Sequence, residues 1–132
     1  ARSLQMALNQ AGMKTTDIDY INAHATSTPQ GDANEAQSIH QVFGDVKPPV
    51  SSTKSMTGHE CWMAGASEII YSLQMMHNDF VAPNINFEEP DEFSAKLNIQ
   101  PTTINKKINV FLSNSFCFGG TNSSLIVKRW NQ

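Results

Sequence analysis

The chain has 132 residues, of which 39% are hydrophobic and 16% charged, with a formal net charge of −3. This length suffices for one domain with a hydrophobic core, and the composition is that of an ordinary soluble globular protein. The small negative charge gives no electrostatic basis for nucleic-acid binding, and no apolar run approaches the ~20 residues of a membrane span.

The two cysteines show neither a CxxC pair nor a metal-ligand spacing, so they do not form a disulfide framework. With no visible signal peptide, a reducing, cytoplasmic setting fits, without nucleic acid or membrane as a partner. We expect neither a cofactor nor a metal centre. The chain opens on a helical pattern without an initiator methionine, which indicates a piece of a longer protein.

Apolar periodicity and turn residues predict helices that alternate with strands, in the order α, β, α, β, α, loop, β, β. The first helix ends near Gly12, and a capping-type pair, Asp32 and Glu35, opens the second. The third helix carries an apolar stripe of helical period, made of Trp62, Ala66, Ile69, Ile70, Leu73 and Met76. The strands fall near 18–23, 49–52, 108–114 and 124–128, and a short one is predicted at 97–100 in an otherwise irregular segment, 78–106.

Strands that alternate with helices favour parallel pairing, whereas the Gly-Gly turn between the last two strands favours an antiparallel pair. The sequence therefore predicts an α/β fold. Its mixed sheet, of five strands or fewer, should carry helices on its faces.

The stretch from Ser51 to Glu68, SSTKSMTGHECWMAGASE, concentrates residues that suit catalysis. Thr57 and Glu60 have the spacing of a capping box, which predicts a helix start at Gly58 or His59. In that first turn the helix dipole would favour a neutral imidazole, which can donate a hydrogen bond to an oxygen that gains negative charge. Lys54 precedes it on the strand-to-helix loop. The alternative is a capped surface helix with a solvated lysine and histidine.

A second candidate group follows the first strand. His24 lies just beyond the strand end, where loops of α/β proteins gather ligand groups, and Thr26 and Thr28 add hydroxyls. The alternative is a turn rich in serine and threonine. Glu35 is either a capping residue or the ion partner of Lys54.

Three further features remain open. Glu68 is either solvated or a buried acceptor. Residues 116–122 form a glycine-rich turn between strands, which is either a simple hairpin or a loop whose backbone N–H faces a substrate oxygen behind a guarding phenylalanine. Cys61, near a helix start, is a better nucleophile candidate than Cys117.

Three stretches in this order, INAHATSTPQGDANEA, SSTKSMTGHECWMAGASE and NSFCFGGTN, resemble the C-terminal half of the β-ketoacyl-[acyl carrier protein] synthases. The resemblance implies a thiolase-like half covering residues 1–132, from a parent enzyme that works as a homodimer. It also implies a decarboxylative Claisen condensation in fatty acid synthesis, with malonyl or acyl phosphopantetheine on an acyl carrier protein as partner.

The resemblance assigns roles by motif. It makes His24 and His59 the two active-site histidines and Lys54 the family lysine, paired with Glu35. Thr26 and Thr28 would hold the pantetheine arm, and Phe118 would be the gating phenylalanine whose backbone N–H helps to form an oxyanion hole. Some relatives surround a buried cation with residues that match Asn22, Glu35, Glu68, Ser113 and Asn114.

The sequence departs from the family pattern at Ala25 and at Cys117, where glycine is usual, and at Trp62-Met63, which replaces a small-residue pair. Because cysteine resists the positive φ that glycine allows, the gate is expected to move less freely. The family's nucleophilic cysteine lies in the N-terminal half, and neither Cys61 nor Cys117 matches it. The alternatives are therefore a noncatalytic chain-length-factor type of partner and an unrelated α/β binding domain.

Overall fold

The computed structural model describes residues 1–130, and residues 131–132 of the predicted domain lie outside the described part. The elements follow one another as α1 (Arg2–Ala11), η1 (Thr15–Asp17), β1 (Tyr20–Asn22), α2 (Pro29–Phe43), β2 (Pro49–Ser51), α3 (Lys54–Thr57), η2 (Cys61–Met63), α4 (Ala64–Asn78), β3 (Phe80–Val81), η3 (Ser94–Lys96), β4 (Asn98–Ile99), β5 (Ile104–Asn105), β6 (Val110–Phe116) and β7 (Asn122–Lys128).

The main sheet has five strands in the order β4-β2-β1-β6-β7. β1 is parallel to both β2 and β6, β2 is parallel to β4, and β6 and β7 form an antiparallel hairpin. The predicted mixed sheet is thus confirmed. The sequence missed β3 and β5, which pair antiparallel in a small second sheet, because two-residue strands are too short to show a period.

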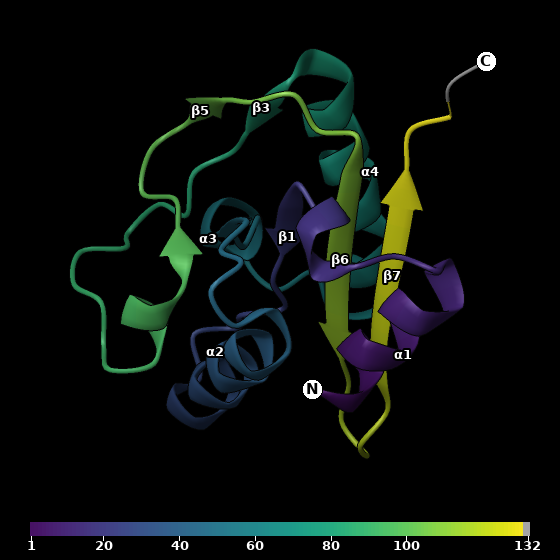
Figure 1. The fold of residues 1–132 in the computed structure, drawn as a ribbon. Helices are drawn as coiled ribbons and strands as arrows, with labels where there is room; N and C mark the ends of the chain where they lie inside the picture. The colour runs from purple at the N-terminus through teal and green to yellow at the C-terminus, as the bar shows by residue number, and fades with distance from the viewer. Residues whose placement is uncertain (131–132) are drawn as a thin grey trace.

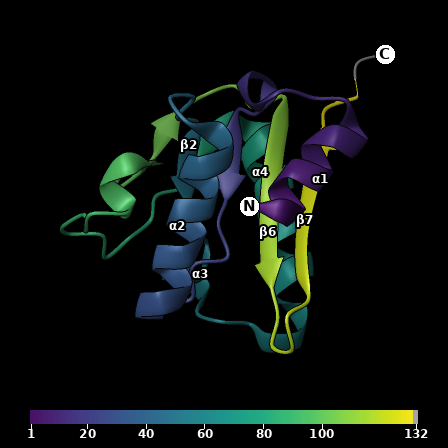
Figure 2. The ribbon, with the colours of Figure 1, turned by 60° about the horizontal axis from the view of Figure 1, so that its bottom comes forward.

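Helices cover both faces of this sheet. Figure 1 shows α1 in front of β6 and β7, with α4 behind them, and Figure 2 shows α1 and α2 together on the same side. The strands alternate between these layers: Val110 and Leu112 join the core beneath α1 and α2, whereas Phe111 joins the core beneath α4. Because both faces are buried, the central strands begin with consecutive apolar residues, as in Tyr20-Ile21 and Val110-Phe111-Leu112, before polar residues follow at their ends.

The predicted first helix is confirmed, since α1 ends at Gly12 in the left-handed conformation with φ 62°. The capping pair proposed for the second helix is wrong. α2 begins at Pro29, with Thr28 as the N-cap residue, so Asp32 and Glu35 lie within the helix. Proline at the first helical position has the φ angle the helix needs, which explains the earlier start.

The predicted start of the third helix at Gly58 or His59 is also wrong. α4 begins at Ala64, after the single turn of α3 and the short η2. Gly58 has φ 74° and Cys61 has φ 49°, and both interrupt the helical path. The Thr57 hydroxyl donates to the carbonyl oxygens of residues 53 and 58 instead of forming a capping box.

The buried face of α4 includes only part of the predicted apolar stripe, because Met76 is buried and Ile69 packs against the core while other members do not. The residues it buries are Ala64, Ser67, Glu68, Ser72, Met75 and Met76, while Ile70 is 56% and Leu73 42% exposed. Ser72 and Glu68 bond to Asn22 and Lys54 at the strand ends, so this polar side is buried, and Ile70 and Leu73 face outward. No helix within residues 1–130 has the length and apolarity to cross a membrane.

The exposed side of α4 predicts self-association, because contiguous exposed apolar surface drives protein–protein contact. We expect the apparent mass of the chain in light scattering to rise above 14.6 kDa as concentration increases. Ile70→Lys should reduce this rise, whereas Gln74→Lys, at an exposed polar position of the same helix, should change it less. A constant mass near 14.6 kDa at every concentration would contradict the prediction.

Candidate active site

The side chains of His24, Lys54 and His59 lie together. His24 follows β1 and Lys54 follows β2, and these parallel neighbours end at the same edge of the sheet. The Lys54 Nζ atom is 3.4 Å from His24 Nδ1. The ring centroids of His24 and His59 are 5.7 Å apart, with the rings edge to face. The structure therefore brings these three residues, which are distant in the sequence, into one contacting group.

Lys54 forms its ion pair with Glu68 and not, as the resemblance implied, with Glu35. Lys54 is 8% and Glu68 2% exposed, so both charges are withdrawn from water. Burial raises the pKa of Glu68, and the Lys54 ammonium opposes that rise. α4 therefore supplies the counter-ion of Lys54 from its polar face, which explains why that face is buried.

Glu35 instead holds the loop that carries His24. Its two carboxylate oxygens accept the backbone N–H groups of His24 and Ala25, at 2.9 and 2.8 Å, and one also accepts from Asn114 Nδ2 at 2.9 Å. Burial raises the pKa of Glu35, while these hydrogen bonds lower it. Ala25 has φ 23°, which an alanine rarely adopts, so the carboxylate fixes a strained turn.

His24 is held as a neutral imidazole. Burial, then the Lys54 ammonium and then His59 lower its pKa to about 4. An ammonium group can only donate hydrogen bonds, so the contact with Lys54 makes His24 Nδ1 the acceptor. The proton of the neutral ring then lies on Nε2. This assignment of the tautomer follows from the hydrogen-bond network.

His59 has the same tautomer for a different reason. The backbone N–H of Cys61 donates to His59 Nδ1 over 2.9 Å, so a neutral ring carries its proton on Nε2. The dipole argument does not apply, because His59 precedes α4 by five residues. The site thus offers two Nε2–H donors on neighbouring rings, and donors of this kind can stabilise negative charge that develops on an oxygen.

The hairpin places one aromatic ring at the site. Phe116, at the end of β6, has its ring centroid 5.6 Å from that of His24. Phe118 lies in the turn between β6 and β7, which the Cys117 N–H closes onto the Thr121 carbonyl oxygen at 2.9 Å. The Phe118 side chain is fully exposed, so its gating role stays a prediction. The sequence analysis missed Phe116, although the paired phenylalanines of the motif were a signal for it.

The structure also places the predicted residues Thr26, Thr28 and Asn22. Thr26 and Thr28 follow His24, and their hydroxyl oxygens are 3.3 Å apart. Asn22 is fully buried below the site and donates to Ser72 Oγ at 3.0 Å. A residue that the sequence analysis missed, Asn84, accepts the Ser52 N–H at the end of β2 and so ties the irregular segment to the site.

Two buried oxygens near Lys54, Asn22 Oδ1 and Glu68 Oε2, have no hydrogen-bond partner among the described residues. A small cation or a water molecule would satisfy them. Within residues 1–130, no cluster of three or more His, Cys, Asp and Glu side chains is arranged as a metal site. A cation here is thus an implication of the resemblance alone, whereas the expectation from the sequence is of no metal centre.

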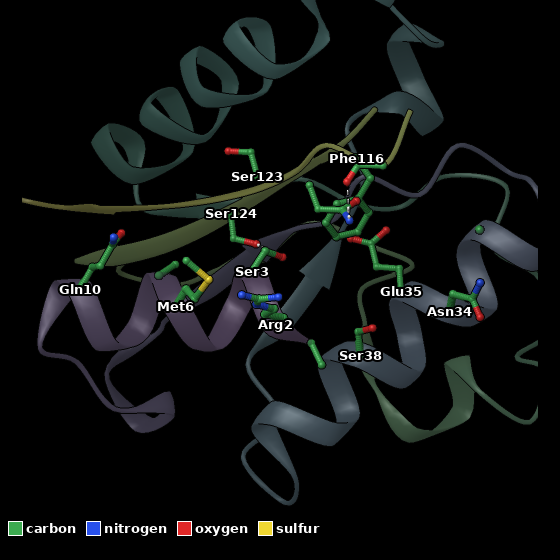
Figure 3. Close-up of a pocket in the computed structure, with 15 residues that line it drawn as sticks. Arg2, Ser3, Met6, Gln10, Asn34, Glu35, Ser38, Phe116, Ser123 and Ser124 are labelled. Atoms are coloured by element: carbon green, nitrogen blue, oxygen red, sulfur yellow. Dashed lines mark hydrogen bonds between the residues drawn. The ribbon is translucent and has the colours of Figure 1, made fainter. Parts of the chain in front are cut away.

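A groove of about 850 Å³ lies between α1 and α2. Figure 3 shows Glu35 and Phe116 near one end of it and Met6 and Gln10 near the other. The buried Glu35 lines this groove as well as a smaller cavity of about 230 Å³ beside residues 84–99. Both cavities therefore border the carboxylate that fixes His24.

Solved structures with the same arrangement are ketosynthases of the thiolase-like class. A β-ketoacyl synthase from Burkholderia phymatum STM815 superimposes with a TM-score of 0.90 at 38% identity, over 98% of this chain and 32% of that one. The ishigamide ketosynthase/chain length factor gives a TM-score of 0.92 at 32% identity, over 97% and 32%. The fold is therefore a thiolase-like α/β half with a mixed five-stranded sheet.

The sequence comparisons name the family. Residues 1–88 match the profile "Beta-ketoacyl synthase, C-terminal domain", so the chain belongs to the β-ketoacyl synthase family. It is 48% identical over 128 residues to 3-oxoacyl-[acyl-carrier-protein] synthase 1 of Escherichia coli strain K12, covering 97% of this chain and 31% of that relative. The corresponding enzyme of Haemophilus influenzae is 56% identical over 117 residues, covering 88% and 29%. The chain thus spans about a third of the curated relatives it matches.

The depressed pKa of His24 predicts a pH-dependent contribution to stability. Between its ordinary pKa of 6.5 and about 4, the unfolded chain binds a proton at His24 that the folded chain excludes. Its contribution to the free energy of unfolding therefore falls as pH decreases through that window. Urea unfolding at several pH values from about 4 to 8 should show the difference between wild type and His24→Gln changing mainly below about 6.5. Parallel pH curves for the two proteins would contradict this.

Proposed function

We propose that this chain is the C-terminal half of a 3-oxoacyl-[acyl carrier protein] synthase. In this proposal residues 1–132 form one thiolase-like domain, and the complete enzyme catalyses decarboxylative Claisen condensation in fatty acid synthesis. The observation that carries the proposal is the pair of Nε2–H donors on His24 and His59 beside the buried Lys54–Glu68 pair.

The chemistry follows from these donors. The thioester carbonyl oxygen of a malonyl group would accept both Nε2–H bonds. The bond between the α-carbon and the carboxylate carbon then breaks, and carbon dioxide leaves. The electron pair of that bond stays with the α-carbon and forms an enolate, so negative charge grows on the same thioester oxygen. The two hydrogen bonds strengthen as the charge develops, so they lower the barrier without any proton transfer. Lys54 helps to keep His24 neutral, because its positive charge disfavours imidazolium.

The rest of the reaction needs groups that this chain does not supply. The enolate carbon would attack an acyl thioester on the nucleophilic cysteine, which the family carries in its N-terminal half. In the proposal, Thr26 and Thr28 bind the phosphopantetheine arm, and the backbone N–H of Phe118 stabilises the second oxyanion. No cofactor is involved.

The proposed partners follow from the same reaction. Malonyl and acyl groups would arrive on an acyl carrier protein. A type II PKS ketosynthase of the same fold, bound to the hexaketide, has been solved with its acyl-carrier protein, at 32% identity and a TM-score of 0.92. The complete enzyme is proposed to be a cytoplasmic homodimer. Glu35, Glu68 and Asn22 support the site and do not contact substrate.

The second candidate is a noncatalytic chain-length factor. A ketosynthase/chain length factor is among the structural neighbours, which favours considering it. His24, Lys54 and His59 in one contacting group favour the enzyme, because a partner without catalysis does not need two neighbouring histidine donors. A nucleophilic cysteine in a strand-to-helix turn of the parent protein would select the enzyme, and its replacement would select the chain-length factor.

The decarboxylation role of the histidines is testable in the complete synthase. His24→Ala and His59→Ala should each lower the rate of carbon dioxide release from malonyl-acyl carrier protein by about 10²–10³-fold, the usual effect of removing one oxyanion donor. His77→Ala, which removes an exposed histidine at the end of α4, is the matched control. Full decarboxylation by either site variant would contradict the proposal.

The isolated chain should not catalyse condensation. Covalent catalysis needs a nucleophile that accepts the acyl group, and neither Cys61 nor Cys117 matches the family's. Intact-mass measurement after incubation with acyl-acyl carrier protein should show the unmodified chain, and no 3-oxoacyl product should form when malonyl-acyl carrier protein is added. A stable acyl adduct on either cysteine together with turnover would show this prediction wrong.

A further inference from the structure

His59 is presented by a short backbone bridge between two helical turns. α3 ends at Thr57 and η2 begins at Cys61, so residues 58–60 belong to neither. Gly58, the first residue of the bridge, and Cys61, which follows it, both have positive φ, and His59 is exposed. A segment with so little packing opens locally at low free energy unless specific contacts hold it.

A side-chain hydrogen bond of Glu60 joins this bridge to α4, in addition to the contact between the His59 and His24 rings. Glu60 Oε1 accepts a hydrogen bond from the Tyr71 hydroxyl over 2.8 Å. Tyr71 lies within α4, and its side chain packs against the core beneath that helix, which contains Tyr20, Phe111 and Met75. The donor therefore lies on a helix that packs against the core, whereas the acceptor lies on the bridge. Hydrogen bonds from Ser67 and Tyr71 lower the pKa of Glu60, so the acceptor is a carboxylate at neutral pH.

We propose that Glu60, held by the Tyr71 hydroxyl, is a positioning residue that sets the orientation of the His59 ring. Glu60 directly follows His59, so fixing its side chain fixes the backbone that carries the imidazole. The same backbone brings the Cys61 N–H to His59 Nδ1, the bond that directs the remaining proton to Nε2. We call the hydrogen bond between Glu60 and Tyr71 the tether. The tether is independent of the proposed function, whereas its effect on decarboxylation rests on that function.

The tether can be tested in the isotope-labelled chain by nuclear magnetic resonance. Tyr71→Phe removes the hydroxyl and keeps the packed ring, and Glu60→Ala removes the acceptor. In both variants the Cys61 amide should exchange with water about fivefold faster, the factor expected for one lost hydrogen bond. The nitrogen chemical shifts of the His59 ring should also change toward the values of an equal mixture of the two tautomers.

Two further variants make the result specific. Glu60→Gln keeps an acceptor oxygen and should retain the wild-type amide exchange and tautomer. Glu92→Ala removes an exposed carboxylate distant in sequence from the bridge and is the matched control for lost charge. The proposal would be overturned if Tyr71→Phe and Glu60→Ala both kept the spectrum of a folded chain and showed no change in the exchange rate of the Cys61 amide or in the tautomer of His59.

The consequence for catalysis is measured separately, in the complete synthase. For malonyl-acyl carrier protein decarboxylation, Tyr71→Phe and Glu60→Ala should lower kcat about fivefold with KM little changed, because the proposed pantetheine contacts at Thr26 and Thr28 are untouched. Glu60→Gln should restore the rate. A changed tautomer with unchanged kcat would overturn the positioning role. A wild-type synthase without decarboxylation would instead refute the proposed function and leave the tether result standing.

Discussion

The buried ion pair between Lys54 and Glu68 is the interaction on which the site depends. Two opposite charges withdrawn from water are tolerable only when each compensates the other, so the pair fixes the end of β2 against one face of α4. The same ammonium reaches His24 Nδ1, where it sets the tautomer of that ring and, after burial, helps to keep it neutral. One lysine therefore links the sheet, the long helix and the candidate catalytic histidine.

This pair also explains where sequence analysis succeeded. Strand ends and polar residues are local features, and parallel neighbours bring their carboxyl ends to the same edge, so His24 and Lys54 could be expected together. The succession of the main-sheet strands along the chain, the Gly12 cap and the final hairpin could also be predicted from the sequence, because each depends on a short local pattern.

The errors have physical causes of another kind. The Thr57–Glu60 spacing fits a capping box, but Glu60 bonds to Tyr71, eleven residues away, and such a distant partner is invisible to a local pattern. Pairing Lys54 with Glu35 was chemically reasonable, yet Glu35 is claimed by two backbone N–H groups and Asn114. Ion-pair choice depends on the packed geometry of three elements, which spacing along the chain does not encode.

The positive φ angles of Ala25, Ser27 and Cys61 have a consequence for the energy of the fold as a whole. All three lie on the loops that carry His24 and His59, and L-residues in such conformations cost on the order of 1–3 kcal/mol each. Native domains are stable by only about 5–15 kcal/mol, so a noticeable share of that margin is absorbed here. The sheet and its two cores are unstrained by comparison. The stability of the sheet and the two cores offsets the cost of these strained conformations. A mutation that weakens either core, even far from the histidines, should therefore first allow these loops to leave their strained conformations.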